Sequence, residues 1–217
     1  MPEDVKPRPY TSSLRQEQAA GTRTRIATAA AELFAAQGYP RTSIEQVAAA
    51  AGVARPTVYV AFGGKPALLE HALDLALAGD DTPVPVGQRP WFQEALRQRD
   101  PYRMLELHAR NLRRICERVA GLYEAVRNAA AADKEVADLY AVLKRQRLAG
   151  ARMVVEPLAA LGPLRDGIDV QTATDLMWHW NDPALWTAMV TDRGWPPDRF
   201  QAWLARSMQE SLLPPRP

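Results

Sequence analysis

The residues best suited to chemistry lie on one side of a short segment, 55–62. At about 100° of rotation per residue, a helix over this segment points Val58 and Phe62 to one side, where both can be buried. The other side chains supply a guanidinium, two hydroxyls and small apolar groups, and they point outward: Arg55, Pro56, Thr57, Tyr59 and Val60. This set suits the major groove of DNA, which presents guanine acceptors and thymine methyls beside its phosphates.

Neighbouring positions suit contacts with a phosphate backbone. Helices that begin near Thr42 or Ser43, and near Lys65, would each point first-turn N–H groups at a phosphate. Between residues 15 and 65, six cations stand against three anions, which gives a local net charge of +3. The whole chain carries only +2, so any basic surface that attracts DNA must be local.

This segment is expected to be the third of four helices. Apolar residues recur at i, i+4, i+7 and i+8 in the first helix, and glycines follow where helices should stop. A capping box at 42–45, or at 43–46 in the alternative register, begins the second helix. A turn at Gly52 then joins two short helices, which is the arrangement of a helix-turn-helix. The expected helices span 22–37, 44–51, 55–62 and 65–78.

The order and spacing of these residues over about 50 positions resemble the DNA-binding domain of TetR-type transcriptional regulators. The resemblance is carried by RIATAAAELF at 25–34, TSIEQVA at 42–48 and GVARPTVYVAFGGKPALL at 52–69. The chain departs from the family pattern at 60–61, where an aromatic residue or histidine is common, and at the glycine pair 63–64. With the resemblance, the expected DNA contacts are Arg23, Thr42, Ser43, Arg55, Pro56, Thr57, Tyr59, Val60 and Lys65.

The rest of the chain also predicts helices. No proline occurs between residues 102 and 156, so long helices can form there, with a break expected near Gly121. The predicted fold is all-α, with a helix-turn-helix DNA-binding domain joined by a helix to a carboxy-terminal helical domain. The expected segments are a flexible tail at 1–20, the helix-turn-helix domain at 21–66, a connecting helix and loop at 67–92, and the ligand-binding and dimerisation domain at 93–217.

The resemblance implies that the carboxy-terminal domain binds a small-molecule inducer. Aromatic, histidine and methionine residues at helical spacing are more often ordinary core residues than ligand contacts, and both interpretations stay open for each residue. The candidate ligand contacts are Tyr102, His108, Tyr123, Tyr140, Met153, Met177 and Trp178.

The resemblance also implies a homodimer, because two recognition helices about 34 Å apart would read a palindromic operator. Five of the six tryptophans fall in the last 40 residues, and tryptophan and methionine are favoured where two protein surfaces meet. The candidate interface residues are Trp180, Trp186, Phe200, Trp203, Leu204 and Met208.

These features together predict a ligand-responsive transcriptional regulator, a repressor that an inducer releases from its operator. Two alternatives remain: an all-α small-molecule-binding protein or enzyme without DNA binding, and a helix-turn-helix that contacts only proteins. Against an enzyme, the sequence has no P-loop, no glycine-rich dinucleotide loop and no Gly-x-Ser-x-Gly motif.

The composition and the apolar patterning of the chain exclude several other classes of protein. The 217 residues are 47% hydrophobic and 24% charged, which excludes a chain that is disordered as a whole. No apolar stretch approaches the ~18–20 residues of a membrane span, and no basic-then-apolar run opens the sequence. One cysteine cannot form an internal disulfide, and the three histidines lack metal-ligand spacing. We therefore expect a cytoplasmic protein without metal or cofactor, whose partners are operator DNA, a second copy and a small molecule.

Overall fold

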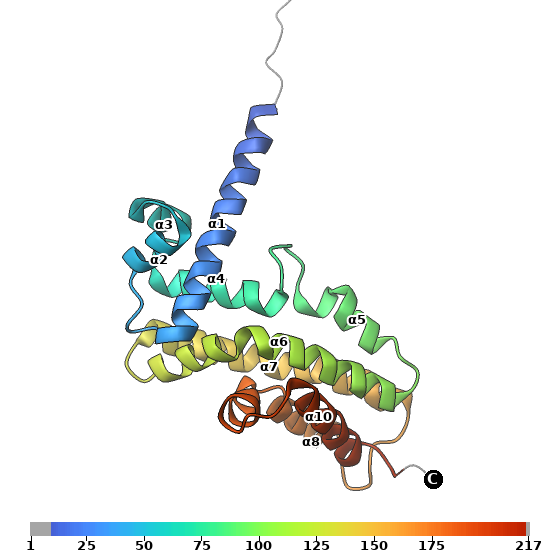
Figure 1. Cartoon of the computed structure of the whole chain (residues 1–217). Helices are drawn as coiled ribbons and strands as arrows, with labels where there is room; N and C mark the ends of the chain where they lie inside the picture. The colour runs from blue at the N-terminus through green and yellow to red at the C-terminus, as the bar shows by residue number, and fades with distance from the viewer. Residues whose placement is uncertain (1–9, 216–217) are drawn as a thin grey trace, which may run out of the picture.

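The computed structural model describes residues 10–215, with side chains from residue 15 onward. Helices form all the regular structure of this described range, which confirms the all-α prediction (Figure 1). The elements are α1 (Tyr10–Gln37), α2 (Ile44–Ala51), α3 (Arg55–Phe62), α4 (Lys65–Ala78), the 3-10 turn η1 (Val86–Gln88), α5 (Pro90–Leu96), α6 (Pro101–Ala129), α7 (Lys134–Leu161), α8 (Val170–Trp180), α9 (Pro183–Trp186), the π-helical turn η2 (Thr187–Asp192) and α10 (Pro197–Leu212).

The first helix is longer than the sequence pattern indicated. It begins at Tyr10, so residues 10–20 are helical rather than part of a flexible tail, and residues 1–9 of that predicted tail lie outside the described residues. No proline interrupts the chain from residue 10 to residue 39, and a polar helix needs no apolar stripe where nothing packs on it. Figure 1 shows these first turns extending beyond the neighbouring helices. The boundaries 21–66, 67–92 and 93–217 stay predictions.

The amino-terminal helices α1, α2 and α3, with the start of α4, form a unit that we call the head. Its core gathers side chains that are at most 1% exposed, among them Ile26, Phe34, Val47, Val58 and Leu68. The turn between α2 and α3 passes through Gly52, whose φ of 66° is left-handed and favours glycine. The head therefore holds α3 against α1 and α4 and leaves its other side open.

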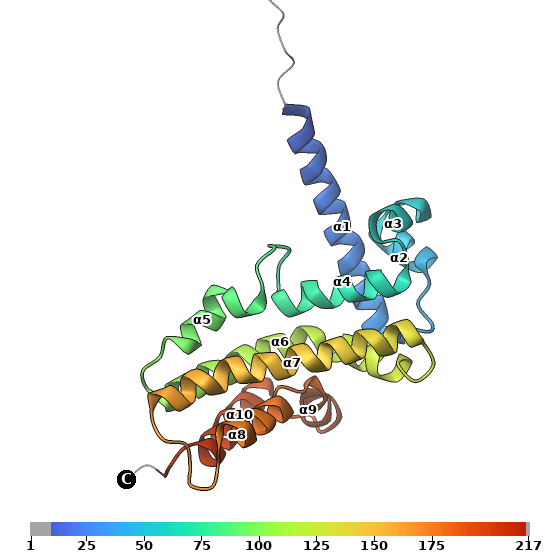
Figure 2. The same cartoon turned by 180° about the vertical axis from the view of Figure 1, so that it is seen from behind.

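Helices α5 to α10 form the larger unit, which we call the body. The long helices α6 and α7 run side by side, and α8 and α10 lie together against them (Figure 2). α6 is continuous through Gly121, where the sequence suggested a break. A Cβ at Gly121 would lie 2.9 Å from the Cβ of Ala35, so glycine at this position allows α1 to approach α6 closely.

Helix α4 links the two units. It packs against α1 and α6, and the Arg118 guanidinium on α6 donates hydrogen bonds to the carbonyl oxygens of Ala76 (2.7 Å) and Leu77 (3.1 Å) in its last turn. A cation at a helix carboxyl end also interacts favourably with the helix dipole. Between residues 10 and 215, no helix is both long and apolar enough to span a bilayer.

Candidate nucleic-acid interface and ligand cavity

One face of α3 is open to solvent. Val58 is 1% exposed and Phe62 is buried against the head core, whereas Val60 is 89% exposed. The two sides of the helix thus divide as the 100° rotation predicts. The exposed side chains are the five proposed for the major groove: Arg55, Pro56, Thr57, Tyr59 and Val60.

Arg55 lies in an exposed cluster with Glu45 of α2 and Tyr59 of its own helix. Its Nε is 2.8 Å from a Glu45 carboxylate oxygen, and its Nη2 donates to the Tyr59 hydroxyl at 3.3 Å. The Tyr59 hydroxyl first, then the Glu45 carboxylate, raise the pKa of Arg55. Because water surrounds all three groups, this pairing is weak, and the guanidinium is free to exchange the carboxylate for a base edge or a phosphate.

Arg23 and Lys65, both proposed as DNA contacts, have partners inside the head. The Arg23 guanidinium donates to the carbonyl oxygen of Ala61 and lies 4.5 Å from the centroid of the Phe62 ring, so it ties α1 to the end of α3. The Lys65 amine lies 4.1 Å from the centroid of the Tyr39 ring. Partial burial lowers the pKa of Lys65, and the nearby Asp133 carboxylate opposes that shift.

The structure removes Thr42 from the proposed contacts. Thr42 is 1% exposed, and its hydroxyl donates to the carbonyl oxygens of Gly38 (2.9 Å) and Leu33 (3.3 Å) within the head. A hydroxyl that is already bonded and buried cannot reach a phosphate. Sequence spacing alone placed Thr42 at the helix start but could not show that it points inward.

Ser43 caps α2, which resolves the register of the capping box. Its hydroxyl oxygen accepts the N–H of Gln46 at 3.2 Å, and the Gln46 side-chain oxygen accepts the N–H of Ser43 at 2.8 Å. The Ser43 side chain is half-buried. Its hydroxyl lies at the amino end of α2, where a phosphate can approach, and it also donates a hydrogen bond to the Glu45 carboxylate.

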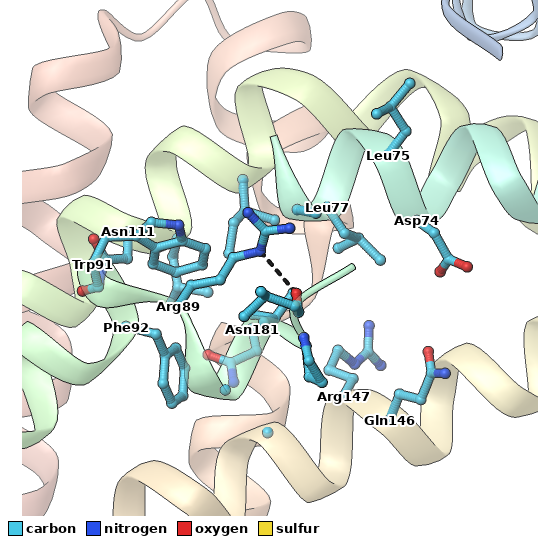
Figure 3. Close-up of a pocket in the computed structure, with 18 of the residues that line it drawn as sticks. Asp74, Leu75, Leu77, Arg89, Trp91, Phe92, Asn111, Gln146, Arg147 and Asn181 are labelled. Carbon is cyan, nitrogen blue, oxygen red and sulfur yellow. Dashed lines mark hydrogen bonds between the residues drawn. The ribbon is translucent and has the colours of Figure 1, made fainter. Parts of the chain in front are cut away.

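The body contains a cavity of about 760 Å³ between α4, the loop 80–89, α6 and α7. Figure 3 shows side chains from these elements around the same space, with Leu77 of α4, Phe92 of α5 and Arg147 of α7 among them. Most of the lining is apolar or aromatic, and a few polar groups lie between these residues. This is the usual character of a small-molecule site.

The loop over the cavity is held by a buried cation. Arg89 is 4% exposed, and its guanidinium donates to the carbonyl oxygens of Val84 (3.1 Å) and Thr82 (2.9 Å). It also pairs with the Asp80 carboxylate at 2.6 Å, and hydrogen bonds from Arg89 and Thr82 lower the pKa of Asp80 to about 2. The charge of Arg89 is thus used within the loop itself.

Two buried polar pairs line the deeper part of the cavity. His108 Nε2 lies 3.1 Å from the side-chain oxygen of Asn181, so this nitrogen carries the proton and donates it. Burial lowers the pKa of His108 to about 4, with that hydrogen bond opposing the shift, so the ring is neutral near pH 7. Asn111 donates its amide to the carbonyl oxygen of Trp91 at 2.9 Å.

Three of the seven proposed ligand contacts line the cavity: His108, Tyr123 and Met153. The other four lie elsewhere. The Tyr102 hydroxyl donates to the carbonyl oxygen of Pro214, and Met177 is fully buried in the body core. Tyr140 belongs to α7 and contacts Lys144 one turn along it, and Trp178 of α8 donates to the Lys144 carbonyl oxygen. Lining residues that the sequence did not single out include Arg89, Trp91, Phe92, Asn111 and Arg147. The adjacent aromatics at 91–92 were the one local signal available, because the cavity is assembled from distant segments.

The single chain already buries most of the proposed dimer interface. Five of its six residues are at most 8% exposed and so offer little surface to a second copy: Trp180, Trp186, Phe200, Leu204 and Met208. Their apolar sides are covered by the body's own helices, α6 above all. Only Trp203 is half-buried and reachable, with its ring 6.0 Å from that of Trp195.

Comparisons with known proteins agree with this architecture. Residues 26–72 match the family described as "Bacterial regulatory proteins, tetR family". A curated relative, the HTH-type transcriptional regulator TtgW of Pseudomonas putida, is 46% identical over 56 residues. That match spans 26% of this chain and 42% of the relative, less than half of its length.

Similar solved structures extend the likeness of fold to most of the chain. The SmeT–triclosan complex has a TM-score of 0.67 at 21% identity and covers 91% of this chain and 98% of that one. The transcriptional regulator FadR from Bacillus subtilis, in complex with stearoyl-CoA, has a TM-score of 0.64 at 16% identity and covers 85% of this chain and 96% of that one.

Proposed function

We propose that this chain, whose residues 26–72 form a domain of the tetR family of bacterial regulatory proteins, is a homodimeric transcriptional repressor that a small molecule releases from its operator. The observation that carries the proposal is the open face of α3, where five side chains suited to a major groove are exposed while Val58 and Phe62 are buried. The head supplies DNA binding, and the body supplies the ligand response and the second copy.

The charge and hydrogen-bonding groups of the head support DNA as the partner. Arg55 can donate two hydrogen bonds to a guanine, and the exposed Val60 can contact a thymine methyl. Arg23 and Lys65 hold the head together through contacts of their own. We therefore assign base reading to Arg55, Pro56, Thr57, Tyr59 and Val60 and phosphate contact to Ser43, with Lys65 as a nearby cation.

The cavity supports a ligand response. It lies against α4, whose first turn belongs to the head and whose later residues Asp74, Leu75 and Leu77 line the cavity. A ligand that shifts α4 therefore shifts the head of its chain, and coupling free energies of such sites are typically about 1–3 kcal/mol. The solved neighbours named above bind triclosan and stearoyl-CoA, which differ in charge, so the fold by itself does not choose the ligand.

A dimer supports operator recognition, because one eight-residue helix reaches only a few base pairs. Apolar side chains that remain half-buried near the carboxyl end, Trp195 and Trp203 among them, offer surface that a second copy can cover. We place the interface on the outer side of α8 and α10, where Trp203 is the one residue of the six sequence candidates that is within reach of a second copy.

The test is binding to DNA from the region upstream of the chain's own gene, measured by fluorescence anisotropy. Arg55→Ala should weaken binding to that fragment by about fivefold or more, since one good bidentate base contact gives about 1–3 kcal/mol. Arg97→Ala removes an exposed cation of the same kind at the end of α5, outside the head and the proposed interface, and serves as the matched control. Specific binding should also weaken steeply as salt is raised.

Two results would contradict this function. Equal affinities for the wild type, Arg55→Ala and Arg97→Ala would mean that α3 does not read the DNA. Failure of the wild type to bind any fragment of its own upstream region would favour the alternative of a small-molecule-binding protein without DNA binding, because the cavity would then be the only candidate site in the described part of the chain.

A further inference from the structure

Four side chains that line the cavity each have a buried polar atom without a hydrogen-bond partner in the described range: His71, Asn111, Tyr123 and Arg147. Tyr123 and Arg147 lie together. Tyr123 is 6% exposed, and its hydroxyl has no hydrogen-bond partner among residues 10–215. The Arg147 side chain is 8% exposed, and its Nε likewise has no partner in the described range. Both residues line the cavity. Because a buried polar group without a partner costs free energy, such groups are rare in folded proteins and indicate a missing partner.

Both atoms can donate a hydrogen bond. An arginine Nε is a donor and never an acceptor. Burial raises the pKa of Tyr123 to about 12, so that the phenol keeps its proton across the physiological range. The Arg147 guanidinium carbon lies 6.0 Å from the centroid of the Tyr123 ring, which places the two side chains at the same end of the cavity. A molecule that satisfies them must therefore bring an acceptor atom.

The charges around the cavity favour an acceptor without a net charge. Arg147 already has a countercharge, since its Nη1 lies 2.5 Å from an Asp182 carboxylate oxygen, although outside hydrogen-bonding geometry. Arg89 has its own countercharge in Asp80. An anionic ligand would thus be buried without a free cation, which is costly. Three carboxylates line the cavity: Asp80 is paired with Arg89, and Asp74 and Asp81 are exposed residues, where water screens a cationic ligand from them.

Figure 3 shows Trp91 and Phe92 apart from Arg147, with Asn111 and Arg89 beside them. The two rings meet edge to face with centroids 6.0 Å apart, and the apolar side chains of Val86 and Met153 also line the cavity. Aromatic rings pack well against such an edge-and-face arrangement. A volume of about 760 Å³ lies within the range of pockets for drug-sized molecules.

We propose that the cavity binds an uncharged, mainly aromatic molecule with one oxygen acceptor, such as a ketone or lactone carbonyl, and that Tyr123 Oη and Arg147 Nε donate to that oxygen. The aromatic part lies against Trp91 and Phe92. This assignment names the ligand class of the proposed function and rests on that function only for the release of DNA, because binding to the cavity is measured on the protein alone.

The first test compares four probes that share a naphthalene ring: 2-acetylnaphthalene, 2-ethylnaphthalene, 2-naphthoate and (2-naphthylmethyl)trimethylammonium. Their dissociation constants for the full chain are measured by isothermal titration calorimetry at pH 7.5. The ketone should bind about fivefold or more tightly than the hydrocarbon, because it satisfies buried donors. It should also bind tighter than either charged probe.

The second test removes one hydroxyl. Tyr123→Phe should raise the dissociation constant of the ketone about fivefold and leave that of the hydrocarbon unchanged. The midpoint of unfolding should stay equal or rise, because the hydroxyl has no partner within the described chain. Tyr140→Phe is the matched control. The Tyr140 ring meets that of Tyr123 at a centroid distance of 6.1 Å but does not line the cavity, so this variant should bind all four probes as the wild type does.

Several outcomes would overturn the proposal. Equal affinities for the ketone and the hydrocarbon, tighter binding of the carboxylate or the ammonium probe, or an unchanged ketone affinity in Tyr123→Phe would each contradict recognition of a neutral acceptor. Failure of all four probes to bind would do the same. Operator binding by the wild type, measured separately, distinguishes these failures from failure of the proposed function, since Arg55 and the cavity are tested independently.

Discussion

The head and the body each pair an arginine with a tyrosine, and the two pairs are used in opposite ways. On α3 the guanidinium carbon of Arg55 lies 5.4 Å from the centroid of the Tyr59 ring, and both side chains are exposed. In the cavity Arg147 lies 6.0 Å from the centroid of the Tyr123 ring, and both side chains are more than nine-tenths buried. The first pair is in contact with water, whereas folding has removed most of the water from the second.

This difference in burial suits the two arginine–tyrosine pairs to different kinds of partner. Exposed groups keep their hydration until a partner arrives, so they suit a long charged surface such as DNA, whose binding is dominated by counterion release. Buried groups have lost their hydration on folding, so they favour any ligand that restores the missing hydrogen bonds. The second pair also borders the cavity of about 760 Å³.

The largest expected effect compares two phenylalanines in these regions. Phe34 is fully buried in the head core, and Phe34→Ala should lower the free energy of unfolding by about 4 kcal/mol. Phe92 is also buried but forms part of the cavity wall, where one side of its ring already lacks protein neighbours. Phe92→Ala should therefore cost about half as much. Urea unfolding of both variants measures the difference, and equal costs would mean that the cavity is not an open space in solution.

The second prediction is a pH dependence that belongs to the body. The pKa of His108 falls from 6.5 in the unfolded chain to about 4 in the fold, because burial disfavours the charged ring. The unfolded chain then binds the extra proton between these two values, so this contribution to stability is complete above pH 6.5 and is lost as the pH falls toward 4. A shift of this size corresponds to about 3 kcal/mol.

His108→Gln isolates this contribution, because glutamine can still donate to the Asn181 oxygen but does not titrate. Urea unfolding at pH 4.5, 5.5, 6.5 and 7.5 should show that the wild type loses more stability than the variant on going down the series. Parallel curves for the two proteins would show that His108 is accessible to protons in the folded state and that this part of the body is not closed.

The sequence predicted the head more closely than the body, and the reason is the distance between interacting residues. The bounds of α2 and α3 were predicted to the residue, because caps, prolines and glycines act within a few positions. The amino end of α1 was missed, since a polar helix without packing partners has no apolar period to detect. The inward direction of Thr42 was also missed, because no pattern in the sequence shows that its hydroxyl bonds the carbonyl oxygens of Leu33 and Gly38.

The cavity and the dimer face depend on residues that are far apart in the chain. Arg147 gave no signal within α7, because its partner Asp182 is 35 positions away and only the fold brings them together. The apolar side of α10 could face either a second copy or its own chain. The structure packs Phe200 and Met208 against the body core, so that side faces inward.

A third, smaller effect tests the junction of the two regions. Gly121→Ala places a Cβ 2.9 Å from that of Ala35, closer than packed carbons tolerate, so α1 and α6 must separate slightly. We expect a loss of about 1.5 kcal/mol in the free energy of unfolding. Gly150→Ala makes the same substitution within α7, where no atom lies within 4 Å, and should stabilise the protein by about 0.5–1 kcal/mol. If both variants were stabilised, the close approach of head and body would be contradicted.

The smallest expected effect separates two roles of Ser43, the capping of α2 and the proposed contact with a phosphate. Ser43→Ala and Gln46→Ala each remove one half of the same capping box, so each should cost about 1 kcal/mol in thermal or urea unfolding. Only Ser43→Ala also removes a hydroxyl that we assign to a phosphate. It should therefore weaken operator binding more than Gln46→Ala does, with an unchanged salt dependence, because a neutral hydroxyl releases no counterion. Equal operator affinities for the two variants would leave Ser43 as a helix cap alone and restrict DNA contact to the open face of α3.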